Sequence, residues 1–149
     1  MNEVDNAAVL NVLERYKAAV FAKDVEAFVA LYAADIHVFD TWAEWSREGI
    51  EAWRGVAVEW FGSLGDERVV VDFSEVRARV TPEFASLNAF VRYAAIDRQD
   101  RELRSMSNRL TMVLRPVDAG GAGGPSWKVV HEHTSAPVDP DTGKVILTR

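Results

Sequence analysis

The chain places its predicted helices, with one short strand among them, before its long strand-forming segments, and this order limits the folds that it can adopt. Apolar residues recur at helical spacing up to about residue 64, and long strand-like runs separated by short turns follow. Helices followed by consecutive antiparallel strands are typical of an α+β fold. A long, twisted sheet curled over such helices would form a cone with a pocket between the two layers.

Three helices are predicted in the first part of the chain, because apolar side chains recur there every three or four residues. Asp24 stands where an N-cap belongs, and the preceding connection is so short that the first two helices should form a hairpin. The predicted helices run from Asp5 or Asn6 through Val20, over residues 25–32, and from about Gly49 to Leu64.

Five strand segments are predicted, each rich in β-branched and aromatic residues and most of them bounded by turn residues. The segment 116–126, with four Gly and two Pro, is the clearest loop, and 41–47 is a second loop that carries Trp42 and Trp45. The predicted strands are Ile36–Asp40, Val69–Val80, Phe84–Ile96, Leu103–Arg115 and Trp127–Pro137.

Length and composition favour one globular domain over residues 1–149, with 138–149 as a tail that could add a short strand. Hydrophobic residues make up 48% of the chain and charged residues 27%, which is typical of a globular protein. The absence of Cys excludes disulfides and thiolate metal sites. A net charge of -6 argues against nucleic-acid binding. Because no signal peptide or membrane-spanning run is visible, we expect a cytoplasmic protein without a membrane partner.

The last predicted strand has two mixed faces. Strict alternation places Trp127, Val129, His131 and His133 on one face, opposite Lys128, Val130, Glu132 and Thr134. Such faces suggest that one side lines a partly polar cavity and the other meets a partner. The two histidines could face either side. Paired imidazoles can bind zinc or iron, but packed histidines are the commoner outcome, so we predict no metal and no cofactor.

The same strand carries a family resemblance through its W-x-V-V-H-x-H-x-S-x-P run. It resembles the closing strand of SnoaL-like proteins of the nuclear transport factor 2-like superfamily. Within them it is most similar to the association (hub) domain of calcium/calmodulin-dependent protein kinase II. The resemblance covers about Leu10 to Pro137. It implies an α+β cone with three N-terminal helices packed on a strongly curved, mostly antiparallel sheet. That superfamily includes enzymes, binding modules and oligomerisation domains.

Two arginines stand within apolar strand segments. Arg92 lies in the middle of residues 89–94, and Arg109 lies in the neighbouring predicted strand. A guanidinium stays charged in a protein, so a buried one needs an anion or a full set of acceptors. Two arginines converging on one pocket would suit a bound carboxylate. The alternative is structural pairing with an internal acid, namely Glu132, Asp72 or Glu75.

The hub-domain resemblance implies that both arginines bind a ligand. Arg92 matches the Arg of the family's A-Y-I-R phrase and Arg109 that of its T-R-V phrase, and both face the central pocket in that family. The chain departs from the pattern at Thr134, which replaces a third pocket arginine, and at Trp53, which replaces a histidine. The expected ligand-binding residues are Arg92, Arg109, Trp53, Trp42, Glu132, Thr134 and Asn108.

A more distant similarity to bacterial ketosteroid isomerases suggests catalysis. Tyr16 and Asp40 match the oxyanion-hole tyrosine and the general-base aspartate of those enzymes, where a carboxylate in an apolar pocket moves a proton. The second oxyanion acid is absent, because Arg109 occupies its place. The alternative is that Tyr16 is a core residue and Asp40 a strand-end cap.

Three functions therefore remain open. The leading prediction is a small-molecule-binding domain whose pocket takes a small organic anion, such as a carboxylate, or a polar metabolite. The second is a proton-transfer or hydration enzyme that uses Asp40 and Tyr16. The third is an oligomerisation module. We also expect a homodimer formed through the outer face of the sheet.

Overall fold

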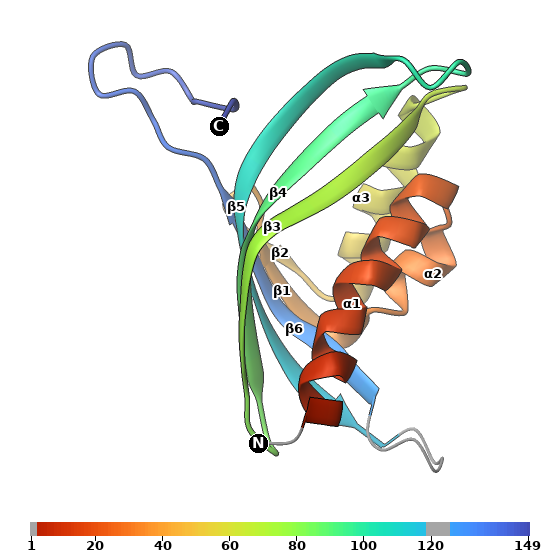
Figure 1. The fold of residues 1–149 in the computed structure, drawn as a ribbon, viewed down its shortest axis with the longest axis vertical. Helices are drawn as coiled ribbons and strands as arrows, with labels where there is room; N and C mark the ends of the chain where they lie inside the picture. Colours follow the sequence, from red (N-terminus) through yellow and green to blue (C-terminus); the bar gives the residue numbers. More distant parts are fainter. Residues whose placement is uncertain (1–2, 119–125) are drawn as a thin grey trace.

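Three helices cover the concave face of one curved sheet in the computed structural model, which describes residues 3–118 and 126–149 (Figure 1). No helix in this described part is long and apolar enough to cross a membrane. The α+β cone predicted from the sequence is confirmed. The helices are α1 (Glu3–Ala22), α2 (Val25–Val29) and α3 (Ile50–Ser63).

The sheet has six described strands in the order β2-β1-β6-β5-β4-β3. Among them only β1 and β6 run parallel, so the sheet is mostly antiparallel, as predicted. The last strand of the chain therefore lies between the first and the longest. The strands are β1 (Tyr32–Phe39), β2 (Arg47–Glu48), β3 (Arg68–Val80), β4 (Ala85–Ile96), β5 (Glu102–Val117) and β6 (Ser126–Ser135).

Pairing with β6 ends the second helix earlier than its apolar periodicity predicts. The backbone N–H of Val129 donates to the carbonyl of Leu31 at 2.9 Å, and Tyr32 pairs with Val129. Residues 30–32 therefore leave the helix, and β1 begins four residues before the predicted strand. Asp24 caps α2 as expected, because its side chain accepts from the N–H of Ala27 at 3.0 Å.

Other boundaries also differ from the predictions. The first helix begins at Glu3, so Asp5 and Asn6 lie inside it and do not precede it. The predicted loop 41–47 ends in the short strand β2, which pairs with β1. Part of the predicted loop 116–126 extends β5, and residues 119–125 lie outside the described part of the chain.

Phe28 joins the helical layer to the aromatic core. Its ring contacts five other rings at centroid distances of 5.3–6.4 Å, and the side chain is 1% exposed. Aromatic rings bury large areas, so this cluster contributes much of the packing between the layers. The five partners are Tyr16, Tyr32, Trp53, Trp60 and Phe61.

A β-bulge at Val130 divides β6 into two segments of opposite phase. Leu114 pairs with Val129, whereas the preceding residue of β5, Val113, pairs with His131, so Val130 is the extra residue. Trp127 and Val129 are buried before the bulge, and Glu132 and Thr134 are buried after it. The strict alternation predicted for this strand is therefore wrong. His131, His133 and Ser135 face away from the helices.

The C-terminal tail folds back over the outer side of the sheet. Val138 and Val145 form an isolated bridge, and the N–H of Ser107 donates to the carbonyl of Leu147 at 2.7 Å. At its end, the Arg149 guanidinium lies 3.7 Å from the centroid of the Phe90 ring. The tail is thus attached to the face of β4 and β5 that points away from the cone.

Candidate functional site

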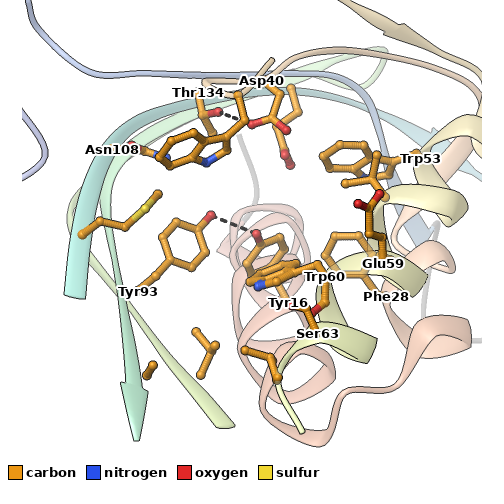
Figure 2. Close-up of a pocket in the computed structure, with 18 of the residues that line it drawn as sticks. Tyr16, Phe28, Asp40, Trp53, Glu59, Trp60, Ser63, Tyr93, Asn108 and Thr134 are labelled. Atoms are coloured by element: carbon orange, nitrogen blue, oxygen red, sulfur yellow. Dashed lines mark hydrogen bonds between the residues drawn. The ribbon is translucent and has the colours of Figure 1, made fainter. Parts of the chain in front are cut away.

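A cavity of about 630 Å³ lies between the helices and the concave face of the sheet (Figure 2). This volume is within the range of pockets that bind small organic molecules. Much of its wall is aromatic, with polar groups from β1, β5 and β6. The aromatic lining comprises Tyr16, Phe28, Trp42, Trp53, Trp60 and Tyr93, and the inner polar lining comprises Asp40, Asn108, Glu132 and Thr134.

Glu132 is a buried carboxyl group in this lining. Its side chain is 3% exposed, and the Tyr32 hydroxyl donates to Oε1 at 2.8 Å. Burial raises the pKa of Glu132 to about 7; the Tyr32 hydrogen bond lowers this pKa, and the negative charge of Asp40 raises it. Both the protonated and the ionised carboxyl are therefore populated near neutral pH, which suits an acid–base catalyst.

Asp40 is held at the end of β1 through contacts with Thr134. The Thr134 hydroxyl donates to Oδ1 of Asp40 at 3.4 Å, and it accepts from the N–H of Thr41 at 3.1 Å. Figure 2 shows Asp40 and Thr134 together at one side of the cavity. No ion pair to Asp40 is formed among the described residues. Its carboxylate is therefore free of a cationic partner within the chain described.

Two phenols meet across the cavity. The hydroxyl groups of Tyr16, from α1, and Tyr93, from β4, lie 2.9 Å apart (Figure 2). Burial raises the pKa of both tyrosines well above the ordinary value, and each is raised further by nearby acidic side chains. Both stay protonated at physiological pH. Since one hydroxyl donates to the other, the accepting hydroxyl keeps its own proton available for a ligand.

Asn108 contributes an amide to the same cavity. Its side chain is 5% exposed, and Oδ1 has no hydrogen-bond partner among the described residues. A buried polar atom without a partner is uncommon in folded proteins. A ligand that donates a hydrogen bond would satisfy it.

The two arginines lie outside the cavity, so the prediction that they face the pocket is wrong. Residues 85, 87, 89, 91 and 93 of β4 face inward, which places Arg92 on the outer face. In β5 the inward residue is Asn108, and Arg109 points outward. Arg92 pairs with Glu102 at 2.9 Å, and Nε of Arg109 donates to Ser135 at 2.9 Å. The pairing predicted with Glu132, Asp72 or Glu75 is not formed by either described guanidinium.

His131 and His133 face away from the cavity. With His37 they surround the ring of Phe39 at centroid distances of 4.8–5.4 Å. Nδ1 of His131 lies 2.8 Å from the carbonyl oxygen of His37. Within residues 3–118 and 126–149, no three His, Cys, Asp or Glu side chains are placed to hold a metal.

Seven of the nine residues selected from the sequence line the cavity. The tertiary structure adds Tyr93, which sequence reasoning missed, and Tyr32, which holds Glu132. Strand alternation in β4 could have identified Tyr93, because Tyr93 continues the inward-facing series of Ala89 and Val91. Trp45, which follows Trp42 in the predicted loop 41–47, lines an outer groove and not this cavity. The seven are Tyr16, Asp40, Trp42, Trp53, Asn108, Glu132 and Thr134.

Comparisons with known proteins agree with this architecture. The family model described as a SnoaL-like domain matches residues 9–139. No curated protein matches the chain. A nuclear transport factor 2-like protein of unknown function from Pseudomonas putida KT2440 has a TM-score of 0.83 at 23% identity, over 100% of this chain and 98% of that one.

Two further solved structures have the same fold. One, from Xanthomonas campestris, carries the provisional name of a calcium/calmodulin dependent protein kinase II association domain. It has a TM-score of 0.70 at 16% identity, over 87% of this chain and 85% of that one. The other is a protein of unknown function with a cystatin-like fold from Nostoc punctiforme. Its TM-score is 0.69 at 15% identity, over 94% and 95% of the two chains. The predicted resemblance is confirmed.

Proposed function

Because the chain belongs to the SnoaL-like domain family of the nuclear transport factor 2-like superfamily, we propose that its cavity binds a small organic molecule and moves a proton on it. One observation carries this proposal. A buried carboxyl group with a pKa of about 7, Glu132, lines an aromatic cavity that also contains Asp40 and a pair of phenols. Carboxyl groups with such pKa values are typical of acid–base sites.

The chemistry that fits this arrangement is proton transfer next to a carbonyl group. The ionised Glu132 accepts a proton from the carbon beside the carbonyl; the electron pair of that C–H bond forms the C=C bond of an enolate, and the π electron pair of the C=O bond moves to the oxygen. The free proton of the Tyr16–Tyr93 pair donates a hydrogen bond to this oxygen. Protonated Glu132 then returns the proton to carbon, so the cycle needs no other reactant. The charge of Asp40 keeps Glu132 basic enough for the first step.

This proposal replaces the small carboxylate as the expected ligand. That expectation depended on Arg92 and Arg109, and both guanidinium groups lie on the outer face. The inner acids, Asp40 and Glu132, would repel a carboxylate. Asp40 keeps a place in the proposed site, as the charge that tunes Glu132.

The test is hydrogen exchange at carbon. Small cyclic and aryl ketones, with and without an amino group, are incubated with the protein in D₂O, and loss of the α-proton signal is followed by NMR. We expect catalysed exchange with at least one ketone, and Glu132→Gln should slow it by about 10²- to 10⁴-fold. Glu83→Gln, which changes an exposed carboxylate in the β3–β4 turn, is the matched control. Equal rates in Glu132→Gln and the unchanged protein would exclude Glu132 as the acid–base group.

We further propose that the chain forms a homodimer through the outer face of β1 and β6. Phe39, at 36% exposure, lies there among the three histidines, and Trp45, at 98%, borders the same groove. Exposed aromatic clusters of this kind are typical of protein interfaces. A dimer would leave the cavity of each copy on the opposite face of its sheet, so assembly and proton transfer are compatible.

A further inference from the structure

Three acidic or amide side chains of the cavity wall, Asp40, Glu132 and Asn108, have hydrogen-bond acceptor capacity that the described residues do not fill. Asp40 accepts a hydrogen bond from Thr134 but has no cationic partner in the described chain. Of the two carboxyl oxygens of Glu132, only Oε1 accepts a hydrogen bond from a described residue. The buried Oδ1 of Asn108 accepts none within the same residues. Three acceptors, on β5, on β6 and directly after β1, therefore line one cavity, and at least one of them carries a negative charge.

The arginines at the edge of the cavity do not neutralise these groups. Arg104 is bound to Glu67 by two hydrogen bonds of 3.1 and 2.7 Å, and its side chain is largely exposed. Nη1 of Arg47, in β2, lies 3.6 Å from Oε2 of Glu44, and the buried Nε of Arg47 has no hydrogen-bond partner among the described residues. Each guanidinium group has a carboxylate neighbour other than Asp40, and neither forms an ion pair with Asp40 among the described residues.

The rest of the wall is suited to a cation as well. Trp53 and Trp60 from α3, with Tyr16 and Tyr93, place four aromatic rings around the space next to the acceptors (Figure 2). Rings of this kind attract positively charged groups through the negative potential of their faces, with tryptophan the strongest. An anion or a purely apolar ligand would pack against these rings but would leave the acceptors of Asp40, Glu132 and Asn108 without a donor.

We propose that the ligand of this cavity carries a positively charged nitrogen, as in a protonated amine, held by Asp40 and Asn108 within the aromatic wall. The inference rests on the proposed function only in taking the cavity as the ligand site. It concerns which molecule binds and not whether a proton is then moved.

Three probes of similar size and different charge test the inference, namely benzylammonium, benzyl alcohol and benzoate. Binding of each to the full chain is measured by calorimetry at pH 7.5, where benzylamine is protonated. We expect benzylammonium to bind about ten- to a hundredfold more tightly than benzyl alcohol, because a charge-assisted hydrogen bond is added. Benzoate should bind more weakly than the alcohol.

Two variants locate the effect. Asp40→Asn should remove most of the preference for benzylammonium while leaving the binding of benzyl alcohol within about twofold, since only the charge is lost. Glu83→Gln, the exposed carboxylate control, should keep the full preference. If Asp40→Asn fails to fold, the comparison of the three probes on the unchanged protein still decides the question.

Equal affinity for the three probes, tighter binding of benzoate, or no detectable binding of benzylammonium at millimolar concentration would overturn the inference. The ketone exchange experiment is independent of these results. A cation-selective protein that exchanges no ketone proton would retain the inference and refute the proposed proton transfer. A protein that exchanges ketone protons but shows no preference for benzylammonium would refute the inference and retain the proposed proton transfer.

Discussion

At the scale of single residues, Glu132 is the group whose environment most needs explanation. Burying a carboxyl group without a cation is unfavourable, and the single hydrogen bond from Tyr32 does not offset the cost fully, since the pKa of Glu132 still rises to about 7. A residue of this kind reduces the stability of the folded chain when it ionises. Its presence in a cavity wall, and not in the packed core, indicates a role in ligand chemistry.

The pKa of Glu132 predicts how stability depends on pH. The folded protein holds this proton up to about pH 7, whereas the unfolded chain releases it near 4.5. The free energy of unfolding should therefore fall as pH rises from 4.5 to 7, by roughly 3 kcal/mol from this group. Glu132→Gln should remove that decrease and be more stable than the unchanged protein at pH 8. Urea denaturation of both proteins between pH 4.5 and 8 measures the free energy of unfolding. The same dependence of this free energy on pH in both proteins would contradict the prediction.

At the scale of elements, the phase of each strand decides which residues reach the cavity. A shift of one residue moves a side chain from one face of a sheet to the other. On β5, Asn108 faces the cavity and its neighbour Arg109 faces outward. On β6, the bulge at Val130 turns Glu132 toward the cavity and His133 outward. The site therefore depends on strand phase as much as on residue type.

Cysteine labelling tests these phases, because the chain contains no Cys of its own. Arg109→Cys should react with a bulky maleimide in the folded state, and His133→Cys should do so in the Phe39→Asp background, where the proposed dimer is absent. Asn108→Cys and Glu132→Cys, each next to an exposed position, should react only after unfolding, since both native side chains are at most 5% exposed. Mass spectrometry of the labelled chains gives the rates. Fast labelling of Glu132→Cys in a folded protein would contradict the bulge.

At the scale of the whole molecule, the two faces of the sheet have separate chemistry. The concave face carries the aromatic cavity, and the convex face carries arginines, histidines and the ring of Phe39. The C-terminal tail also lies on the convex side (Figure 1). This separation allows one face to bind a ligand while the other meets a second copy.

The proposed homodimer predicts a measured mass of two chains. Sedimentation at tens of micromolar should give this value, since a specific dimer buries more than about 1,000 Å² in total. Phe39→Asp should shift the protein to monomers by placing a charge in the contact. Phe84→Asp, which changes an exposed ring in the β3–β4 turn, should leave the dimer intact. A monomeric unchanged protein would refute the proposed association.

The sequence by itself determined the fold class, the order of the main elements and seven of the residues that line the cavity. Helical periodicity, strand alternation and turn residues are local properties, so they could be recognised without coordinates. The motif of the last strand and the positions of Tyr16 and Asp40 led to the prediction of a pocket. The cavity in the structure is lined by Tyr16 and Asp40, and by Trp53 and Thr134.

Only the tertiary structure decided which face each strand presents and where the second helix ends. The bulge at Val130 and the early end of α2 both result from pairing between β6 and distant parts of the chain, which no local pattern encodes. The same pairing turns Glu132 inward beside Asp40, and burial there raises its pKa. The charge of the cavity thus depends on contacts about a hundred residues apart in sequence, as between Tyr32 and Glu132.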